Sequence, residues 1–144
     1  MKDESIFIDT NILLYAIDEI DQSKHQKAKK LIEESFRKRR NFTASIQVLG
    51  EFFNASTKKL KTSLSKEESK EFIDYLIKHQ NWEIKKQEKT TLMKAIDLSI
   101  KYNNPFWDSL IAATMIENGL TKIYTENTKD FEKIKEIEAI NPLI

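Results

Sequence analysis

The fold class of this chain is decided by residues 5–11, SIFIDTN. Ile6, Phe7 and Ile8 are apolar at successive positions, which is typical of a central parallel strand that is buried on both faces. The run ends abruptly at the polar residues 9–11. Because open parallel sheets bind ligands outside the carboxyl ends of their strands, this stretch predicts a buried strand followed directly by a candidate site.

Further along the chain, helical patterns alternate with short apolar runs. Strands are expected at residues 5–8, 42–44, 82–84, 120–125 and 138–140, with helical segments between them. This alternation favours an α/β fold with a central, mainly parallel sheet of about five strands and helices on both faces. Neither an internal repeat nor a linker composition is visible, so residues 1–144 are expected to form a single domain.

Capping residues predict where several helices begin and end. Capping-box patterns at Ser23 and Ser65 indicate two helix starts, and Ser45 is the expected cap of a third helix. Thr90 or Thr91 is expected to open a further helix, which should end at residues 103–105. The next helix should cover residues 106–118, with a glycine just past its end.

The composition excludes several kinds of chemistry. The chain has 144 residues and no Cys, so disulfides, thiolate zinc sites and cysteine nucleophiles are excluded, and two His leave no histidine-rich metal site. An apolar fraction of 40% with 33% charged residues is typical of a globular domain.

The charge balance and the N-terminal residues indicate where such a protein would work. The net charge of +1 does not draw the whole molecule onto nucleic acid or a membrane surface, so an anionic substrate must be held locally. No apolar run approaches the roughly 18 residues of a membrane span, and no signal-peptide pattern is present. We therefore expect a cytoplasmic protein that makes no membrane contact.

Asp9 allows two interpretations. With Thr10 and Asn11 it forms a carboxylate supported by two hydrogen-bonding side chains at the end of a strand, where a metal site is expected. The same three residue types are also good N-caps for a helix over residues 12–17. Taken alone, the pattern favours the cap.

Two more carboxylates lie on expected helices. Residues 111, 112, 115 and 116 form an apolar stripe that puts Asp108 on the buried face of its helix, where an ionised carboxylate needs a partner or a cation. The alternative is stabilisation by the free N–H groups of the first turn. Glu51 lies just beside the apolar face of its own helix, from which it can reach over the rim of a cleft.

Taken together, these motifs resemble those of PIN-domain nucleases. Residues 8–13, IDTNIL, are similar to the opening motif of that family; Glu51 in QVLGEFFN (residues 47–54) and Asp108 in WDSLIAA (residues 107–113) match its next two acids. The resemblance covers essentially the whole chain. In size and single-domain form the chain is similar to the VapC-type toxins of toxin/antitoxin pairs.

The resemblance is incomplete at the fourth acid. The family often has an Asp after the fourth strand, in a Thr-x-Asp arrangement, whereas this chain has Thr125-Glu126-Asn127. Asn127 therefore occupies the acidic position. Asp130 and Glu126 are the two candidates to replace it.

The resemblance implies hydrolysis of RNA phosphodiester bonds with Mg²⁺ or Mn²⁺. Carboxylate oxygens suit these hard cations, which activate water and neutralise phosphate. The implied catalytic residues and metal ligands are Asp9, Glu51 and Asp108, with Asp130 or Glu126 as a further ligand. Four neighbours would orient them, namely Thr10, Asn11, Thr125 and Asn127. The implied partners are an RNA substrate, a cognate antitoxin protein and a second copy of the chain in a homodimer.

Three other functions were compared with this one. A phosphatase of the haloacid dehalogenase type also has an Asp after strand one, but it needs a second Asp where this chain has Asn11. A receiver domain needs an Asp after the third strand, and none follows residues 82–84. A PIN scaffold that has lost a metal ligand and acts by binding a partner is consistent with Asn127.

Surface features give weaker indications. Three basic clusters could bind phosphate, but the solvated faces of helices have the same composition. The clusters are Lys27, Lys29 and Lys30; Arg37–Arg40; and Lys58, Lys59 and Lys61. Trp107 could stack on a base, although an aromatic side chain in a first helical turn is more often part of the core. A dimer surface could include Phe36, Phe42, Phe52 or Phe53, each of which could equally be core.

Overall fold

The computed structural model describes residues 4–37, 40–58 and 63–144. It contains a five-stranded sheet in which all neighbouring strands are parallel, in the order β3-β2-β1-β4-β5. The strands are β1 (Ile6–Ile8), β2 (Phe42–Ser45), β3 (Trp82–Lys85), β4 (Lys122–Tyr124) and β5 (Glu138–Ile140). The predicted α/β class and the number of strands are confirmed.

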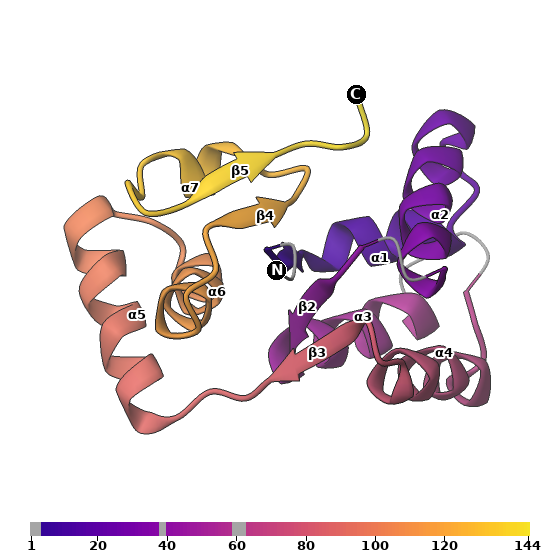
Figure 1. Cartoon of the computed structure of the whole chain (residues 1–144), viewed down its shortest axis with the longest axis horizontal. Helices are drawn as coiled ribbons and strands as arrows, with labels where there is room; N and C mark the ends of the chain where they lie inside the picture. The colour runs from indigo at the N-terminus through magenta and orange to yellow at the C-terminus, as the bar shows by residue number, and fades with distance from the viewer. Residues whose placement is uncertain (1–3, 38–39, 59–62) are drawn as a thin grey trace.

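Helices cover both faces of this sheet, as predicted. Figure 1 shows α5 and α6 on one side and α1, α2 and α4 on the other. The helices in the described residues are α1 (Thr10–Ile17), α2 (Gln22–Phe36), α3 (Ile46–Lys58), α4 (Lys66–Lys78), α5 (Lys89–Tyr102), α6 (Phe106–Glu117) and α7 (Lys129–Glu132). None of them combines the length and the apolar character that are needed to cross a bilayer.

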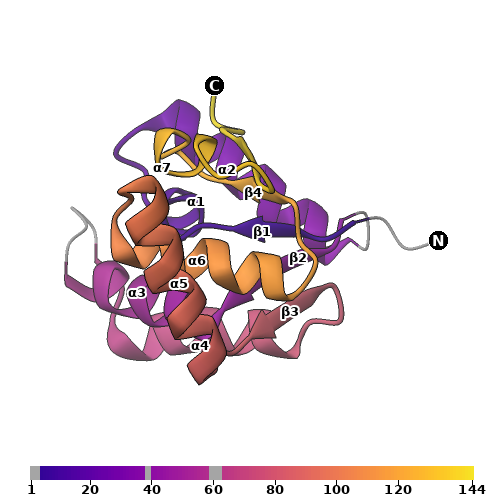
Figure 2. The same cartoon turned by 90° about the vertical axis from the view of Figure 1, so that its left-hand side faces the viewer.

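The order of the strands creates a switch point between β1 and β4. The chain first moves outward from β1 to β2 and β3, and then returns to add β4 and β5 on the other side of β1. Figure 2 shows α6 running alongside the sheet on its way back to β4. Side chains that follow β1 and β4 therefore meet in the crevice where the winding direction changes, which is where ligands bind in open α/β sheets.

Most of the predicted helix ends are confirmed. Ser65 forms the predicted capping box with Glu68, and the Ser45 hydroxyl accepts the Val48 N–H at 3.2 Å. Helix α5 ends as expected before residues 103–105. Gly119 lies just past α6 with φ of +68°, a conformation that favours glycine.

Two helix predictions need correction, and one helix was not predicted. Ser23 does not cap α2, because Asp21 precedes the helix and its side chain accepts the Lys24 N–H. Helix α5 begins at Lys89, and the Thr91 hydroxyl accepts the Glu88 N–H. The four-residue helix α7 was not expected, because so short a helix carries no periodic pattern.

Helix α6 is also buried more completely than predicted. Residues 109–115 are buried without interruption, so the helix has no single apolar stripe. Helix α5 packs extensively against α6 and covers the face that would otherwise meet solvent. Phe42 and Phe52 have no exposed surface and belong to the core, so neither can contribute to a dimer surface, whereas Phe36 and Phe53 are partly exposed.

We expect Ser65→Ala to lower the free energy of unfolding by about 1 kcal/mol. The Ser65 hydroxyl accepts the Glu68 N–H, and the Glu68 carboxylate accepts the Ser65 N–H, so the substitution removes one half of a reciprocal cap. Urea unfolding measures the loss. Ser65→Asp is the control and should stay within a few tenths of a kcal/mol of the wild type, since Asp caps equally well. An equal loss in both variants would contradict the capping explanation.

Candidate acidic site

Asp9 lies at the carboxyl end of β1 and is only 5% exposed. Its Oδ1 accepts the Thr10 backbone N–H at 2.8 Å, and its Oδ2 accepts the Thr125 hydroxyl at 2.7 Å. Asp9 is the N-cap of α1, which confirms the cap interpretation. Burial raises the pKa of the Asp9 carboxyl, its two hydrogen bonds oppose the shift, and the negative charges of Glu51 and Asp130 add to it, so Asp9 belongs to an acidic cluster with these two residues.

Glu51 is half-buried on α3, and both of its carboxylate oxygens have partners. The Thr10 hydroxyl donates to Oε2 at 2.9 Å, and the Gln47 side-chain amide donates to Oε1 at 2.9 Å. Thr10 therefore binds two acids at once, Asp9 through its backbone and Glu51 through its hydroxyl. These contacts hold Glu51 toward the end of β1.

Asp108 is half-buried in the first turn of α6. Its pKa is raised to about 7, first by burial, then by a hydrogen bond to Asp130 and the charge of that residue, and then by the charges of Asp9 and Glu51. Three other carboxylates therefore lie close enough to disfavour its ionised form. The sequence predicted that an ionised Asp108 needs a partner or a cation. In the structure the charged groups that affect Asp108 are other acids, which cannot neutralise it.

The two candidates for the fourth acid, Asp130 and Glu126, have different contacts. Asp130, on α7, interacts with Asp108 and Asp9, and its backbone carbonyl accepts the Asn104 side-chain amide at 2.9 Å. Glu126 instead contacts Lys24 at 2.6 Å and accepts the Tyr15 hydroxyl at 3.1 Å. Both oxygens of Glu126 are thus engaged with groups outside the acidic cluster.

The other side chains that were expected to orient the acids belong to the loop after β4 or contact its backbone. The Asn11 side-chain oxygen accepts the Glu126 backbone N–H at 3.2 Å. The Thr125 hydroxyl accepts the Asn127 backbone N–H at 3.0 Å while it donates to Asp9. Asn127 therefore supports the site through its backbone, and any residue with an N–H could make this contact.

Sequence reasoning missed two side chains that hold the acids, Gln47 and Asn104. A glutamine four residues before Glu51 lies on the same face of a helix, which was the available signal for Gln47. No local pattern links Asn104 to Asp130, because the contact joins segments that are distant in the sequence.

The donor set can be compared with the needs of a divalent cation. In the part of the chain that the structure describes, no three His, Asp or Glu side chains form a group that could hold a metal ion. Mg²⁺, however, is commonly held by one or two carboxylates and retains several waters. The four acids supply the oxygen donors that such an ion prefers, and neighbouring carboxylates raise the pKa of Asp9 and Asp108, so a cation would offset this repulsion and the residues fit a hydrated Mg²⁺ or Mn²⁺.

The predicted basic clusters give no clear phosphate site. Lys27, Lys29 and Lys30 are exposed along α2. Arg40 donates to the Tyr124 hydroxyl at 3.0 Å and pairs with Glu34. Four members of these clusters lie outside the described residues, namely Lys38, Arg39, Lys59 and Lys61. Trp107, by contrast, is 62% exposed beside Asp108, so it is not a core residue.

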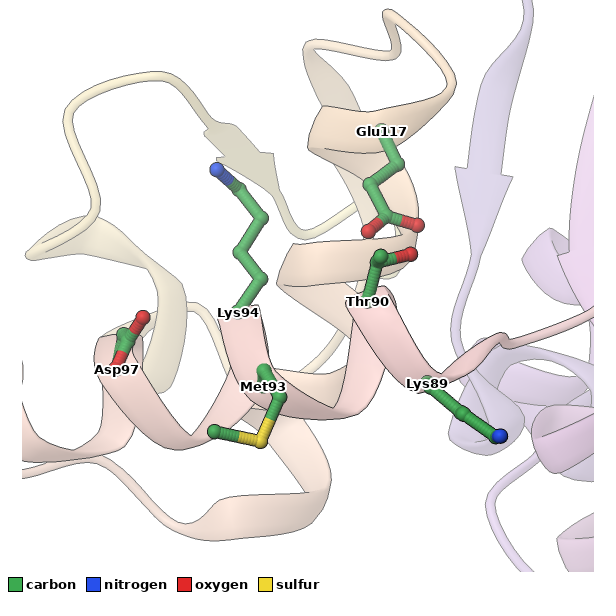
Figure 3. A pocket seen from close by; sticks show the side chains of 6 residues that line it. All are labelled: Lys89, Thr90, Met93, Lys94, Asp97 and Glu117. Atoms are coloured by element: carbon green, nitrogen blue, oxygen red, sulfur yellow. The ribbon is translucent and has the colours of Figure 1, made fainter.

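A hollow elsewhere on the surface is separate from the acids. It has a volume of about 530 Å³ beside α5 and the end of α6, and Figure 3 shows its lining side chains, Lys89, Thr90, Met93, Lys94, Asp97 and Glu117. Glu117 is at the opposite end of α6 from Asp108. None of the four clustered acids lines this hollow.

The family of the chain follows from comparison with known proteins. The PIN domain family model matches residues 6–137, so the chain belongs to the PIN domain family. No curated protein sequence matches it. Among solved structures it is similar to a toxin–antitoxin complex from Klebsiella pneumoniae, with a TM-score of 0.67, 21% identity and coverage of 96% of this chain and 98% of that one.

Two further solved structures have the same fold. The sarcin–ricin loop cleaving toxin VapC20 of Mycobacterium tuberculosis aligns with a TM-score of 0.70 at 18% identity, over 91% of this chain and 95% of that one. VapBC2 from Rickettsia felis, bound to a promoter DNA fragment, aligns with a TM-score of 0.67 at 23% identity, over 94% and 97%. These likenesses confirm the PIN fold that the sequence motifs indicated.

We expect the metal-free protein to lose stability as the pH rises through about 7. The Asp108 carboxyl has a pKa of about 7 in the folded chain against an ordinary value of 3.8, so the folded state binds more protons than the unfolded state between these values. The free energy of unfolding therefore falls as the pH rises through this range. Urea unfolding in EDTA between about pH 5 and about pH 8 measures the slope. Asp108→Asn should flatten it, and an unchanged slope in this variant would contradict the assignment.

Proposed function

We propose that this PIN-domain protein is a metal-dependent endoribonuclease that hydrolyses RNA phosphodiester bonds, and that it is the toxin of a toxin/antitoxin pair. One observation carries the proposal. Asp9, Glu51, Asp108 and Asp130 come from four separate elements and lie at the switch point of a parallel sheet, where the charges of Glu51 and Asp130 raise the pKa of Asp9 and the charges of Asp130, Asp9 and Glu51 raise that of Asp108. Such a concentration of negative charge is costly without a cation.

Asp9, Glu51 and Asp108 would hold Mg²⁺ or Mn²⁺, directly or through water, and Asp130 is the proposed fourth acid. When bound, the cation lowers the pKa of water and neutralises the charge of the scissile phosphate. The protein's own contribution is to keep the acids in place. Thr10 and Thr125 fix the two oxygens of Asp9, and Thr10 and Gln47 fix those of Glu51.

No nucleophilic side chain is needed for this chemistry. The chain has no Cys, and in the described residues His25 contacts the Tyr15 carbonyl and Glu19 while His79 accepts the Asn81 backbone N–H, so both histidines bond to groups outside the acidic cluster. We therefore propose direct hydrolysis by water, without a covalent enzyme intermediate. Trp107 is exposed beside Asp108, where it is free to contact a substrate base.

The proposed partners are an RNA substrate, a cognate antitoxin protein and a second copy of the chain. Support for the antitoxin comes from the similar structures, two of which are a toxin–antitoxin complex and a VapBC2 assembly on promoter DNA. The homodimer rests on the resemblance to VapC-type toxins. Since cellular RNA is the proposed substrate, we place the protein in the cytoplasm.

A PIN scaffold with a weakened site is the second candidate, and Asn127 is the observation that favours it. The position of Asp130 beside Asp108 argues against a weakened scaffold, because Asp130 supplies the fourth acid that Asn127 does not. A haloacid-dehalogenase-type phosphatase is less well supported. Its general acid would have to be Asn11, whose amide cannot exchange a proton as a carboxyl group does and is engaged with the Glu126 backbone.

Cleavage of total RNA by the purified full chain tests the proposal. We expect cutting with Mg²⁺ or Mn²⁺, and loss of cutting when EDTA is in excess. Phosphate released from p-nitrophenyl phosphate in a parallel assay would favour the phosphatase. Absence of cutting with every divalent metal tried would contradict the nuclease proposal and favour the scaffold.

A further inference from the structure

The Gln47 side chain joins two of the proposed ligands that come from different helices. Its Nε2 donates to Glu51 Oε1 at 2.9 Å and to the backbone carbonyl of Trp107 at 3.2 Å. Trp107 immediately precedes Asp108 in the first turn of α6. One amide group on α3 therefore contacts both the Glu51 carboxylate and the backbone that carries Asp108.

Both donors of this amide group are used, which fixes its orientation. Glu51 Oε1 and the Trp107 carbonyl accept hydrogen bonds and cannot donate them, so the NH₂ group must face both. The Gln47 oxygen then points to Gln87, whose Nε2 donates to it at 3.3 Å and also contacts the Thr114 hydroxyl at 3.3 Å. The Gln47 side chain is thus fixed by partners on α3, on α6 and in the segment between β3 and α5.

This contact acts against the repulsion within the acidic cluster. Thr10 hydrogen-bonds to both Asp9 and Glu51, which holds the two carboxylates near each other, and like charges at short range repel, so Glu51 lowers its electrostatic energy by moving away. Thr10 holds one Glu51 oxygen, which leaves the carboxylate free to rotate about that contact. The Gln47 hydrogen bond to the other oxygen removes this freedom.

From these contacts we infer that Gln47 is a positioning residue for the proposed reaction. It sets the placement of Glu51 relative to Asp108, and so the fit of the two carboxylates to a divalent cation, without touching the cation or the substrate. Gln87 supports Gln47 by donating a hydrogen bond to its side-chain oxygen. The inference rests on the proposed function, since it assigns a role within the same metal site.

Calorimetric titration of Mn²⁺ into the metal-free full chain tests the inference with a readout other than activity. Gln47→Met keeps the length of the side chain and removes both donors. Loss of a group that orients metal ligands typically weakens metal binding about 10- to 100-fold, so we expect at least a tenfold loss for this variant. Gln87→Met should give a smaller loss. Gln26→Met, the same change at an exposed position on α2, is the matched control and should bind as the wild type does.

RNA cleavage provides the second readout. Because Gln47 acts on the ligands and not on the substrate, kcat should fall in Gln47→Met while KM for RNA stays within about twofold. A folded Gln47→Met protein with Mn²⁺ affinity within about twofold of the wild type would overturn the inference and leave the proposed function standing. A wild-type chain that binds no Mn²⁺ would overturn the proposed metal site, and the inference with it.

Gln87→Met decides the outcome if Gln47→Met does not fold. Gln87 contacts Gln47 and none of the four acids directly, and we expect the Gln87→Met protein to fold. Weakened Mn²⁺ binding in the folded Gln87→Met protein would support the inference, and unchanged binding would overturn it.

Discussion

An Asp108→Asn variant is expected to lose RNA cleavage by at least about a hundredfold while its fold stays intact, because contacts to a catalytic metal supply several kcal/mol of transition-state stabilisation. Asn keeps the shape of the side chain and removes the charge that would hold the cation. Rates are measured under single-turnover conditions with saturating Mn²⁺. Asp9→Asn is expected to lose activity to a similar extent.

Stability measurements separate this explanation from a structural one. Asp108 is half-buried among acids that raise its pKa to about 7, so removing its charge relieves repulsion and should not lower the melting temperature of the metal-free protein. Asp97→Asn, the same change on the exposed side of α5, is the matched control and should keep full activity. Retained cleavage in Asp9→Asn would remove the basis of the metal-site assignment. A large drop in its melting temperature would instead assign Asp9 a purely capping role.

The second large effect is expected to separate the two candidates for the fourth acid. Asp130→Asn should reduce cleavage about tenfold or more, because the residue interacts with Asp108 and Asp9. Glu126→Gln should stay within about threefold of the wild type, because its carboxylate is bound to Lys24 and Tyr15. The ion pair between Glu126 and Lys24 is partly exposed and screened by solvent, so the Glu126→Gln protein should remain folded.

These two variants are assayed side by side at equal metal concentration. If Glu126→Gln were the more damaging substitution, the fourth acid would be Glu126, and Asp130 would serve only to hold α7. If neither substitution had an effect, the site would work with Asp9, Glu51 and Asp108 alone.

The sequence predicted the fold class because its evidence is local. An uninterrupted apolar run such as Ile6–Ile8 indicates a buried strand, and the capping box at Ser65 indicates a helix start, whatever the rest of the chain does. Asp9 and Asp108 were selected on local grounds, the end of a strand and the buried face of a helix, whereas Glu51 was assigned to the same site through the resemblance to PIN-domain nucleases. Asp9 is both a cap and a member of the acidic cluster, so its two interpretations were compatible.

Other features depended on contacts between distant segments. The apolar face of α6 could be predicted, but its complete burial could not, because that depends on α5 packing against it. Asn127 occupies the expected acidic position along the chain, yet Asp130 interacts with Asp108, because the short helix α7 turns the chain back toward the site. Gln47 had a visible spacing to Glu51, whereas its contact with the Trp107 carbonyl had no local signal.

A five-stranded parallel α/β fold with an acidic site after its first strand could thus be predicted from the residues alone, because hydrophobic periodicity and capping act over a few residues. Which acids come together, and which side chains hold them, depends on how the elements pack. Those choices are made by hydrogen bonds and charges across elements that lie far apart in the sequence, such as Thr125 to Asp9 and Gln47 to Trp107. The contact between Thr125 and Asp9 forms only when the sheet brings the ends of β1 and β4 to the same edge, and the contact between Gln47 and Trp107 forms only when α3 and α6 meet.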